Sequence, residues 1–351
     1  MTHIAKPRFH HPNLPVNAVG LTRRDYEGVV STLCAGCGHD SVTAAIIEAC
    51  FELDIEAHKV AKVSGIGCSS KTTNYFLGRS HGFNSVHGRM PSVATGANLA
   101  NGDLVYIGVS GDGDTASIGL GQFCHAIRRG LNMVYIVENN GTYGLTKGQF
   151  SATNDKHSKG RKGADNLFHP IDLCSLAIEL GAGFVARGFS GDKDQLVPLI
   201  KAAIHYRGFA VIDVISPCVT FNNHAASTKS YDYVRDHNAA MGQLDLVAEA
   251  DEIRADYAAG SSIDVALHDG SSLKLHKLPA SYDPTDHGVV LHELARIKDA
   301  GGVATGLLSI DPNEADLHDL IGTTSTSLNA IDEVDLCPGA DALDAINASH
   351  R

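Results

Sequence analysis

Short apolar runs alternate with amphipathic stretches through the first two thirds of the chain. Four such runs predict strands, at residues 59–64, 104–110, 133–137 and 209–215. Residues 40–53 place Val42, Ile46 and Leu53 on one face and predict a helix, and a second helix is expected at about residues 116–129. This alternation predicts an α/β fold with a doubly wound, mostly parallel sheet and helices on both faces. In such folds ligands bind at the carboxyl ends of the strands.

The pattern changes after about residue 238. Residues 239–351 are more acidic and less strand-like, with candidate helices at residues 242–258 and 292–300. We therefore divide the chain into a ligand-binding domain over residues 1–238 and a C-terminal extension over residues 239–351, whose role local chemistry does not indicate.

Composition excludes several classes of protein. A net charge of −12 argues against nucleic acid as a partner, because phosphate binding needs a basic surface. No apolar run approaches the roughly 20 residues that span a bilayer, so no membrane helix is expected. The first twenty residues are polar and lack a signal-peptide core, which predicts a cytoplasmic protein. In a reducing compartment its eight cysteines are expected to serve metal binding or redox chemistry more than disulfides.

Glycines and hard oxygen donors follow two neighbouring predicted strands. The strand at 104–110 runs into Gly111, Asp112, Gly113 and Asp114, and the next strand ends shortly before Asn140. Glycines let backbone amides approach a phosphate, and the following helix directs its positive N-terminal end to the same space. Asp112 and Asn140 could supply oxygen ligands to Mg²⁺. Each motif alone is equally typical of an ordinary strand-to-helix turn, but together they favour a diphosphate and metal site.

Four cysteines lie near predicted strand ends or helix starts. Cys34 and Cys37 are in LCAGCGH, Cys68 is in SGIGCSSK, and Cys218 is in SPCVTFNNH. Four thiolates suit a [4Fe–4S] cluster or structural Zn²⁺, and the cysteines alone leave both open. Cys337 has no neighbouring cysteine in the sequence. The other cysteines fall within apolar helical patterns and are expected to be core residues: Cys50, Cys124 and Cys174.

These motifs carry a family resemblance. GDG followed by NN resembles the signature of thiamine-diphosphate enzymes. The order CAGCGH, GIGCSSK, GDGD and SPCVTFNNH resembles, over roughly residues 30–240, the β subunits of small-type 2-oxoacid:ferredoxin oxidoreductases. The resemblance implies a thiamine-diphosphate-binding fold with Mg²⁺ held by Asp112, Asn140 and the carbonyl of Thr142. It also implies one [4Fe–4S] cluster on four thiolates, from Cys34, Cys37, Cys68 and Cys218. Ala35 departs from the proline often found there, which affects loop stiffness and not ligation.

The resemblance extends to further contacts with the cofactor. It implies that Asp114 shapes the diphosphate loop with Gly111 and Gly113, and that Leu145 contacts the cofactor. It brings the HGR segment to the diphosphate, where His87 could donate a hydrogen bond; a purely structural loop histidine is the competing interpretation.

Substrate and partners are also implied. Lys71 and Lys147 lie in glycine-rich segments and are candidates for binding substrate carboxylates. Two lysines could match the two carboxylates of 2-oxoglutarate, and CVTFNNHAASTKSYDYVR resembles the 2-oxoglutarate branch; pyruvate and branched-chain 2-oxoacids are alternatives. The implied partners are ferredoxin, coenzyme A and an α subunit. The α subunit would supply the pyrimidine-binding domain and its glutamate. The basic stretch at residues 156–162 is either a solvated loop or a positively charged segment that attracts ferredoxin or coenzyme A.

Two rival functions remain open at this stage. One is half of a non-oxidative thiamine-diphosphate enzyme with structural zinc. The other is an electron-transfer protein in which GDGD is only a turn.

Overall fold

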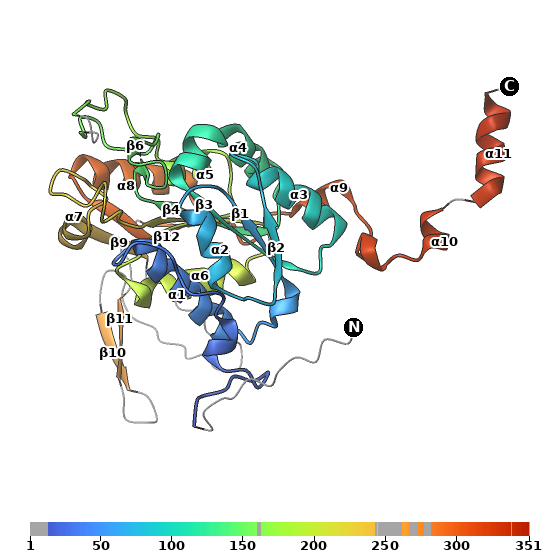
Figure 1. The fold of residues 1–351 in the computed structure, drawn as a ribbon, viewed down its shortest axis with the longest axis horizontal. Coiled ribbons are helices and arrows are strands. Elements are labelled where there is room, and N and C mark those ends of the chain that lie inside the picture. The colour runs from blue at the N-terminus through green and yellow to red at the C-terminus, as the bar shows by residue number, and fades with distance from the viewer. Residues whose placement is uncertain are drawn as a thin grey trace.

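The structure is a computed structural model that describes residues 13–159, 163–242, 244, 262–266, 272–276, 282–337 and 339–350. An eight-stranded sheet crosses the molecule in the order β2-β1-β3-β4-β8-β7-β12-β9 (Figure 1). Its strands are β1 (Val60–Ser64), β2 (His81–Asn84), β3 (Val105–Gly111), β4 (Met133–Asn139), β7 (Phe184–Phe189), β8 (Phe209–Ile215), β9 (Asn238–Gly242) and β12 (Val303–Ile310). All neighbouring pairs are parallel except β12 with β7, so the predicted mostly parallel sheet is confirmed.

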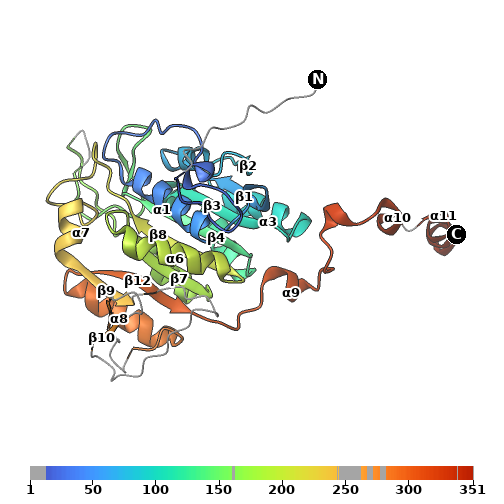
Figure 2. The same cartoon turned by 90° about the horizontal axis from the view of Figure 1, so that it is seen from below.

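Helices cover both faces of the sheet, as Figure 2 shows from below. One face carries α1 (Gly38–Glu52) and α6 (Lys193–His205), whose apolar sides bury Ile46 and Ile200 against the strands. The opposite face carries a larger group, namely α3 (Met90–Ala100), α4 (Leu120–Arg128), α5 (Leu173–Glu179) and α8 (His287–Asp299). Beneath them Phe123, Tyr135 and Phe209 form edge-on and tilted aromatic contacts, with ring centroids 5.2–6.1 Å apart. The two apolar layers fix the sheet as a rigid base for its loops.

The helix expected at residues 116–129 is interrupted. A π-helical turn covers Gly113–Ile118, and the regular helix α4 begins at Leu120. The residue between them, Gly119, approaches Gly88 so closely that an added Cβ would lie 2.8 Å from the Gly88 Cα atom. Apolar periodicity alone cannot reveal such a break, and π-helical turns commonly accompany functional sites.

Segments beyond residue 238 complete the same sheet. β12 pairs with β7, and β9 forms the edge strand beside β12. The helix expected at residues 292–300 is α8, which begins earlier because Asp286 caps it through the amides of Gly288 and Val289. The helix expected at 242–258 lies almost wholly outside the described residues. The domain boundary after residue 238 stays a prediction.

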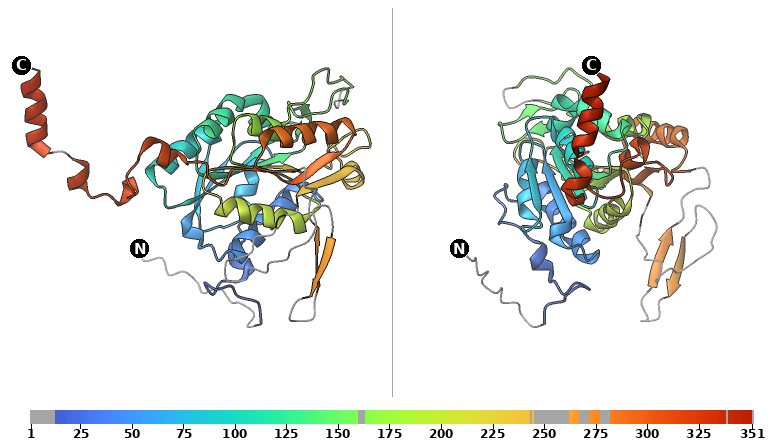
Figure 3. Two further views of the ribbon diagram at one scale, coloured as in Figure 1. Left: turned by 180° about the vertical axis from the view of Figure 1, so that it is seen from behind. Right: turned by 90° about the vertical axis from the view of Figure 1, so that its right-hand side faces the viewer.

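The chain leaves the sheet after β12 as an extended arm (Figure 3). The arm holds α9 (Leu317–Ile321), α10 (Glu333–Leu336) and α11 (Gly339–Ser349), and α10 and α11 stand clear of the sheet and its helices. The described residues also include an antiparallel pair of strands, β10 (Ser262–Ala266) and β11 (Ser272–His276). None of the described helices is both long and apolar enough to span a membrane.

Candidate functional site

Four adjacent parallel strands deliver the candidate residues to one edge of the sheet. Cys68 follows β1, Asp112 follows β3, Asn140 follows β4, and Cys218 follows β8. The segment with Cys37 joins them, because Cys37 immediately precedes α1 and the Gly38 amide donates to the Pro217 carbonyl at 3.3 Å. The order of the strands therefore gathers residues that lie up to 181 positions apart in the sequence (218 − 37 = 181).

The four candidate cysteines are free thiols, and each lies close enough to at least one other of them to influence it electrostatically. A Cβ placed on Gly144 would lie 3.4 Å from the Cys68 Sγ atom and 3.7 Å from the Cys218 Sγ atom, so both sulfurs lie close to this glycine. Burial, together with nearby Glu138, Cys218 and Cys68, raises the pKa of Cys37 to about 12. Burial and then the Cys218 thiol raise the pKa of Cys68, which is also influenced by Cys34.

This thiol group has the chemistry of a metal-cluster site. The raised pKa values of Cys37 and Cys68 mean that the thiolate charges of these two residues are unfavourable without a compensating cation, which iron or zinc would supply. Among the described residues, no three His, Cys, Asp or Glu side chains lie close enough to hold a single metal ion. A four-iron cluster binds each thiolate through a different iron and so separates the sulfurs more widely than one ion does. The donor set fits such a group.

Asp112 is the most heavily hydrogen-bonded carboxylate of the site. It is only 1% exposed, and its Oδ2 atom accepts from the Gly141 amide at 3.1 Å, from the Thr153 hydroxyl at 2.5 Å and from the Ser151 hydroxyl. Its Oδ1 atom makes only a long contact, 3.5 Å, with the Asn140 amide. Burial raises the pKa of Asp112, partly offset by the two hydroxyls. An underused oxygen on a costly buried charge fits a cation such as Mg²⁺.

The neighbouring loops are fitted closely to this carboxylate. The Asn140 Oδ1 atom accepts from the Thr142 amide at 3.0 Å, and Tyr143 donates its hydroxyl to the Gly113 carbonyl at 2.9 Å. A Cβ on Gly113 would lie 2.5 Å from the Tyr143 ring, so this position requires glycine. One pocket is lined by Gly67, Cys68, Asp112 and Asn140, and therefore joins the thiol group to the diphosphate loop.

The HGR segment is tied to the same loop through backbone. Gly88 donates its amide to Asp114 Oδ1 at 2.7 Å, while Asp114 Oδ2 accepts from the Ser110 hydroxyl at 2.9 Å. The His87 side chain is exposed. The geometry therefore brings Asp114 and the HGR backbone together and leaves the role of the His87 ring a prediction.

Of the two candidate lysines, Lys71 ends a short 3-10 helix, Ser69–Lys71, and Lys147 lies in a loop. Lys71 lies three residues beyond Cys68, and its Nζ atom donates to the Thr32 hydroxyl at 3.3 Å. Lys147 is exposed and has a φ of 84°, a left-handed conformation that is uncommon for lysine, in the tight turn between β5 (Thr142–Tyr143) and β6 (Gln149–Phe150). Leu145 in the same turn is 52% exposed.

The remaining predicted features lie apart from the pocket. Cys50 and Cys174 are fully buried in α1 and α5, while Cys124 in α4 is half-buried and Cys337 is exposed. Of the basic stretch, Lys159 forms a 3.9 Å ion pair with Asp165, and residues 160–162 lie outside the described part of the chain.

Sequence reasoning missed several residues of the site. Ser151 and Thr153 contact Asp112 from the segment after β6, and the run SATN is a polar signal that could have indicated them. It also missed a buried pair that lines the pocket, in which the Nδ1 atom of His39 lies 3.7 Å from Glu138 and 2.6 Å from the Ser216 hydroxyl. Burial lowers the pKa of His39 to about 4 and raises the pKa of Glu138, so burial favours the neutral form of each.

His39 gives a prediction for the cofactor-free chain. Its folded pKa of about 4 lies below its ordinary value of 6.5, so its contribution to stability is present above pH 6.5 and is lost as the pH falls towards 4. We expect His39→Gln to reduce this acid-dependent loss by up to about 3 kcal/mol, since each pKa unit is worth about 1.4 kcal/mol. Urea unfolding between pH 4 and pH 7 measures this loss of stability, and His58→Gln, at an exposed histidine, is the control. The prediction would be contradicted if the free energy of unfolding changed with pH equally in His39→Gln and in the unmodified chain.

Several known proteins are similar to this chain in sequence, in fold or in both. Residues 65–214 match the thiamine pyrophosphate enzyme family, C-terminal TPP binding domain. A 2-oxoacid:ferredoxin oxidoreductase subunit beta from Sulfolobus sp is 44% identical over 191 residues, which are 54% of this chain and 63% of the relative. The chain thus spans less than two thirds of that relative's length.

A second relative is matched over nearly its whole length. The 2-oxoglutarate synthase subunit KorB of Methanocaldococcus jannaschii is 33% identical over 250 residues, covering 70% of this chain and 91% of that subunit. The chain belongs to the β subunits of the 2-oxoacid:ferredoxin oxidoreductases. The fold of this β subunit is similar to a solved 2-oxoglutarate:ferredoxin oxidoreductase from Magnetococcus marinus, with a TM-score of 0.73 and 29% identity. That match covers 93% of this chain and 96% of the other, whose structure holds 2-oxoglutarate, coenzyme A and succinyl-CoA.

Proposed function

We propose that this β subunit acts with an α subunit in the coenzyme A-dependent oxidative decarboxylation of 2-oxoglutarate to succinyl-CoA and CO₂, or its reverse, with ferredoxin as electron partner. The observation that carries the proposal is the single pocket shared by Cys68 and the Asp112–Asn140 pair. A thiolate-bound redox group and a metal-bound diphosphate would then be neighbours in one subunit. Electron transfer out of a decarboxylation site needs that proximity.

The proposed cofactor contacts follow from the donor types. Asp112, Asn140 and the Thr142 carbonyl would hold Mg²⁺, and Gly111, Gly113 and Asp114 would shape the diphosphate loop. Thiamine diphosphate, when bound, supplies the nucleophilic carbon and the electron sink for decarboxylation. The chain's part is to orient that group, to neutralise its diphosphate and to hold one [4Fe–4S] cluster on four thiolates, those of Cys34, Cys37, Cys68 and Cys218.

The proposed substrate contacts are Lys71 and Lys147. Lys71 lines a cavity of about 350 Å³ together with Lys62 and Ser64, and the Lys62 ammonium group donates to the carbonyls of Phe76 and Leu77. Such a lining suits a carboxylate. The names of the KorB relatives and the ligands of the Magnetococcus marinus enzyme favour 2-oxoglutarate over pyruvate or a branched-chain 2-oxoacid.

An α subunit is proposed to cover the open side of the site. Large apolar side chains are exposed in loops around it, including Val30 at 89%, Val86 at 71% and Leu145 at 52%. Exposed apolar residues at a site mouth are typical of protein interfaces. We assign the assembly to the cytoplasm, where thiolate ligands stay reduced.

An anaerobic assay tests the proposal. The full chain, purified with its α subunit, is expected to contain iron and acid-labile sulfide and to reduce ferredoxin when given 2-oxoglutarate and coenzyme A, faster than with pyruvate. The chain alone is expected to have little or no turnover. Zinc without iron, or full activity of the isolated chain, would overturn the proposal.

A further inference from the structure

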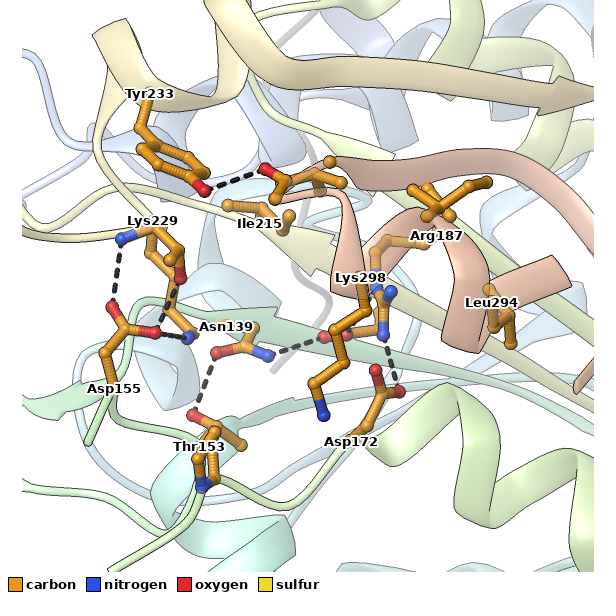
Figure 4. A pocket seen from close by; sticks show the side chains of 18 of the residues that line it. Asn139, Thr153, Asp155, Asp172, Arg187, Ile215, Lys229, Tyr233, Leu294 and Lys298 are labelled. Carbon is orange, nitrogen blue, oxygen red and sulfur yellow. Dashed lines mark hydrogen bonds and ion pairs between the residues drawn. The ribbon is translucent and has the colours of Figure 1, made fainter. Parts of the chain in front are cut away.

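A line of buried polar side chains crosses the face of the sheet beside the site. Arg187 on β7 lies between two carboxylates and donates to Asp172 at 2.7 Å and to Asp213 at 3.2 Å (Figure 4). Arg187 is 8% exposed and Asp213 only 2%. A buried arginine held by two carboxylates has little freedom to reorient, so it fixes the position of Asp213.

The line continues from Asp213 to the diphosphate loop. Asn139, at the end of β4, donates its side-chain amide to Asp213 Oδ1 at 3.0 Å. Its Oδ1 atom therefore faces Thr153, whose Oγ1 atom lies 3.0 Å away and also 2.5 Å from Asp112 Oδ2. Figure 4 shows Asn139 between Thr153 and the arginine–carboxylate pair.

The orientation of the Asn139 amide is set by charge. Reversing it would place a carbonyl oxygen against the Asp213 carboxylate, which is repulsive, and Arg187 already donates to that carboxylate. The Thr153 hydroxyl then donates to the Asp112 carboxylate and the Asn139 oxygen in a three-centre hydrogen bond, with the Ser151 hydroxyl 3.0 Å away as a further neighbour. Such a bond fixes both the place and the direction of the hydroxyl. Asp112 is thereby held with Oδ2 occupied and Oδ1 turned away from these partners.

From this geometry we infer that Arg187 is a positioning residue for the metal–diphosphate site, acting through Asp213, Asn139 and Thr153 on Asp112. The inference rests on the proposed function, because Asp112 is the proposed Mg²⁺ ligand. Groups that orient a metal ligand typically contribute about 10- to 100-fold to metal affinity. Arg187 is four hydrogen bonds from Asp112, and its effect should lie at or below the lower end of that range.

The test measures cofactor binding and not turnover. Equilibrium dialysis of thiamine diphosphate at graded Mg²⁺ concentrations, on the full chain with its partner subunit, gives the Mg²⁺ concentration for half-saturation. We expect Thr153→Val to raise it about tenfold and Thr153→Ser, which restores the hydroxyl, to return it to within about twofold of the unmodified chain. Arg187→Lys is expected to raise it about fivefold. Arg187 borders a cavity of about 190 Å³, so lysine fits without overpacking.

A matched arginine supplies the control. Arg207 also bridges two carboxylates, Asp316 at 2.8 Å and Asp319 at 2.9 Å, but it lies at the surface and away from Asp112. Arg207→Lys is expected to leave the Mg²⁺ dependence unchanged.

A double variant separates positioning from general loosening of the fold. If Arg187 acts through Thr153, adding Arg187→Lys to Thr153→Val should change the Mg²⁺ requirement little further, because coupled residues are not additive. Multiplicative effects, or an Arg187→Lys variant indistinguishable from Arg207→Lys, would overturn the inference and leave the proposed function standing. An unmodified complex that binds no thiamine diphosphate with Mg²⁺ would overturn both.

Discussion

Replacing Cys68 with alanine is expected to abolish cluster binding and, with it, ferredoxin reduction. Cys68 is the candidate cluster ligand that lines the same pocket as Asp112 and Asn140, and the Cys68 and Cys218 sulfurs both lie close to Gly144. Removing one of four thiolates leaves an iron without its protein ligand at the position nearest the proposed cofactor. The iron and acid-labile sulfide content of the anaerobically purified complex measures the loss, together with reduction of ferredoxin by 2-oxoglutarate.

Cys124 offers a control for the loss of any half-buried thiol. It lies in α4 and packs against the apolar layer beneath that helix, and Cys124→Ala is expected to retain the iron and sulfide of the unmodified complex. Full iron content in Cys68→Ala would remove this residue from the ligand set. Loss of iron in both variants would indicate general unfolding, which circular dichroism would reveal.

Replacing Asp112 with asparagine is expected to weaken Mg²⁺-dependent binding of thiamine diphosphate at least about a hundredfold, or roughly 2.7 kcal/mol. The change keeps the shape of the side chain and removes the charge that a hard cation requires. Equilibrium dialysis measures the binding. Asp103→Asn, in the exposed turn before β3, alters a carboxylate near the other end of the same strand and should have no effect.

The same Asp112→Asn change is expected not to lower the stability of the cofactor-free chain, although it weakens cofactor binding. Burial raises the pKa of Asp112, so its contribution to stability is present at low pH and is lost as the pH rises through the folded value. Once the pH exceeds the folded pKa, the buried carboxylate therefore opposes folding of the cofactor-free chain, and Asp112→Asn should not lower its unfolding midpoint. Reduced stability together with reduced binding would contradict a purely ligand role for Asp112.

The sequence predicted those features that depend on neighbouring residues. Apolar runs located β3, β4 and β8 to within two residues at each end, because a buried parallel strand is apolar throughout. The motifs around Asp112 and Asn140 could be recognised in the sequence because each directly follows such a strand. The family follows from the motif order and is confirmed by the relatives.

Other features depend on contacts between distant segments and could not be predicted. The hydroxyl of Thr153 reaches Asp112 across 41 residues, and Asn139 meets Asp213 across 74. Arg187 is a charged residue within a strand, and only the fold shows that two carboxylates enclose it. The antiparallel strand β12 was missed because the C-terminal region was judged by its acidic composition, although residues 303–310 are largely buried.

The candidate cluster ligands follow separate strands, and this constrains the order in which the chain folds and takes up a cluster. Cys34 and Cys37 leave the ribosome about 180 residues before Cys218, and they meet it only when β8 has joined β4. Pairings so distant in sequence form late, since the entropy of closing the intervening loops comes first. Loading of iron and sulfide should therefore follow synthesis of the whole sheet. Chains interrupted before residue 218 would emerge with three exposed, oxidisable sulfurs and nowhere to place a cluster.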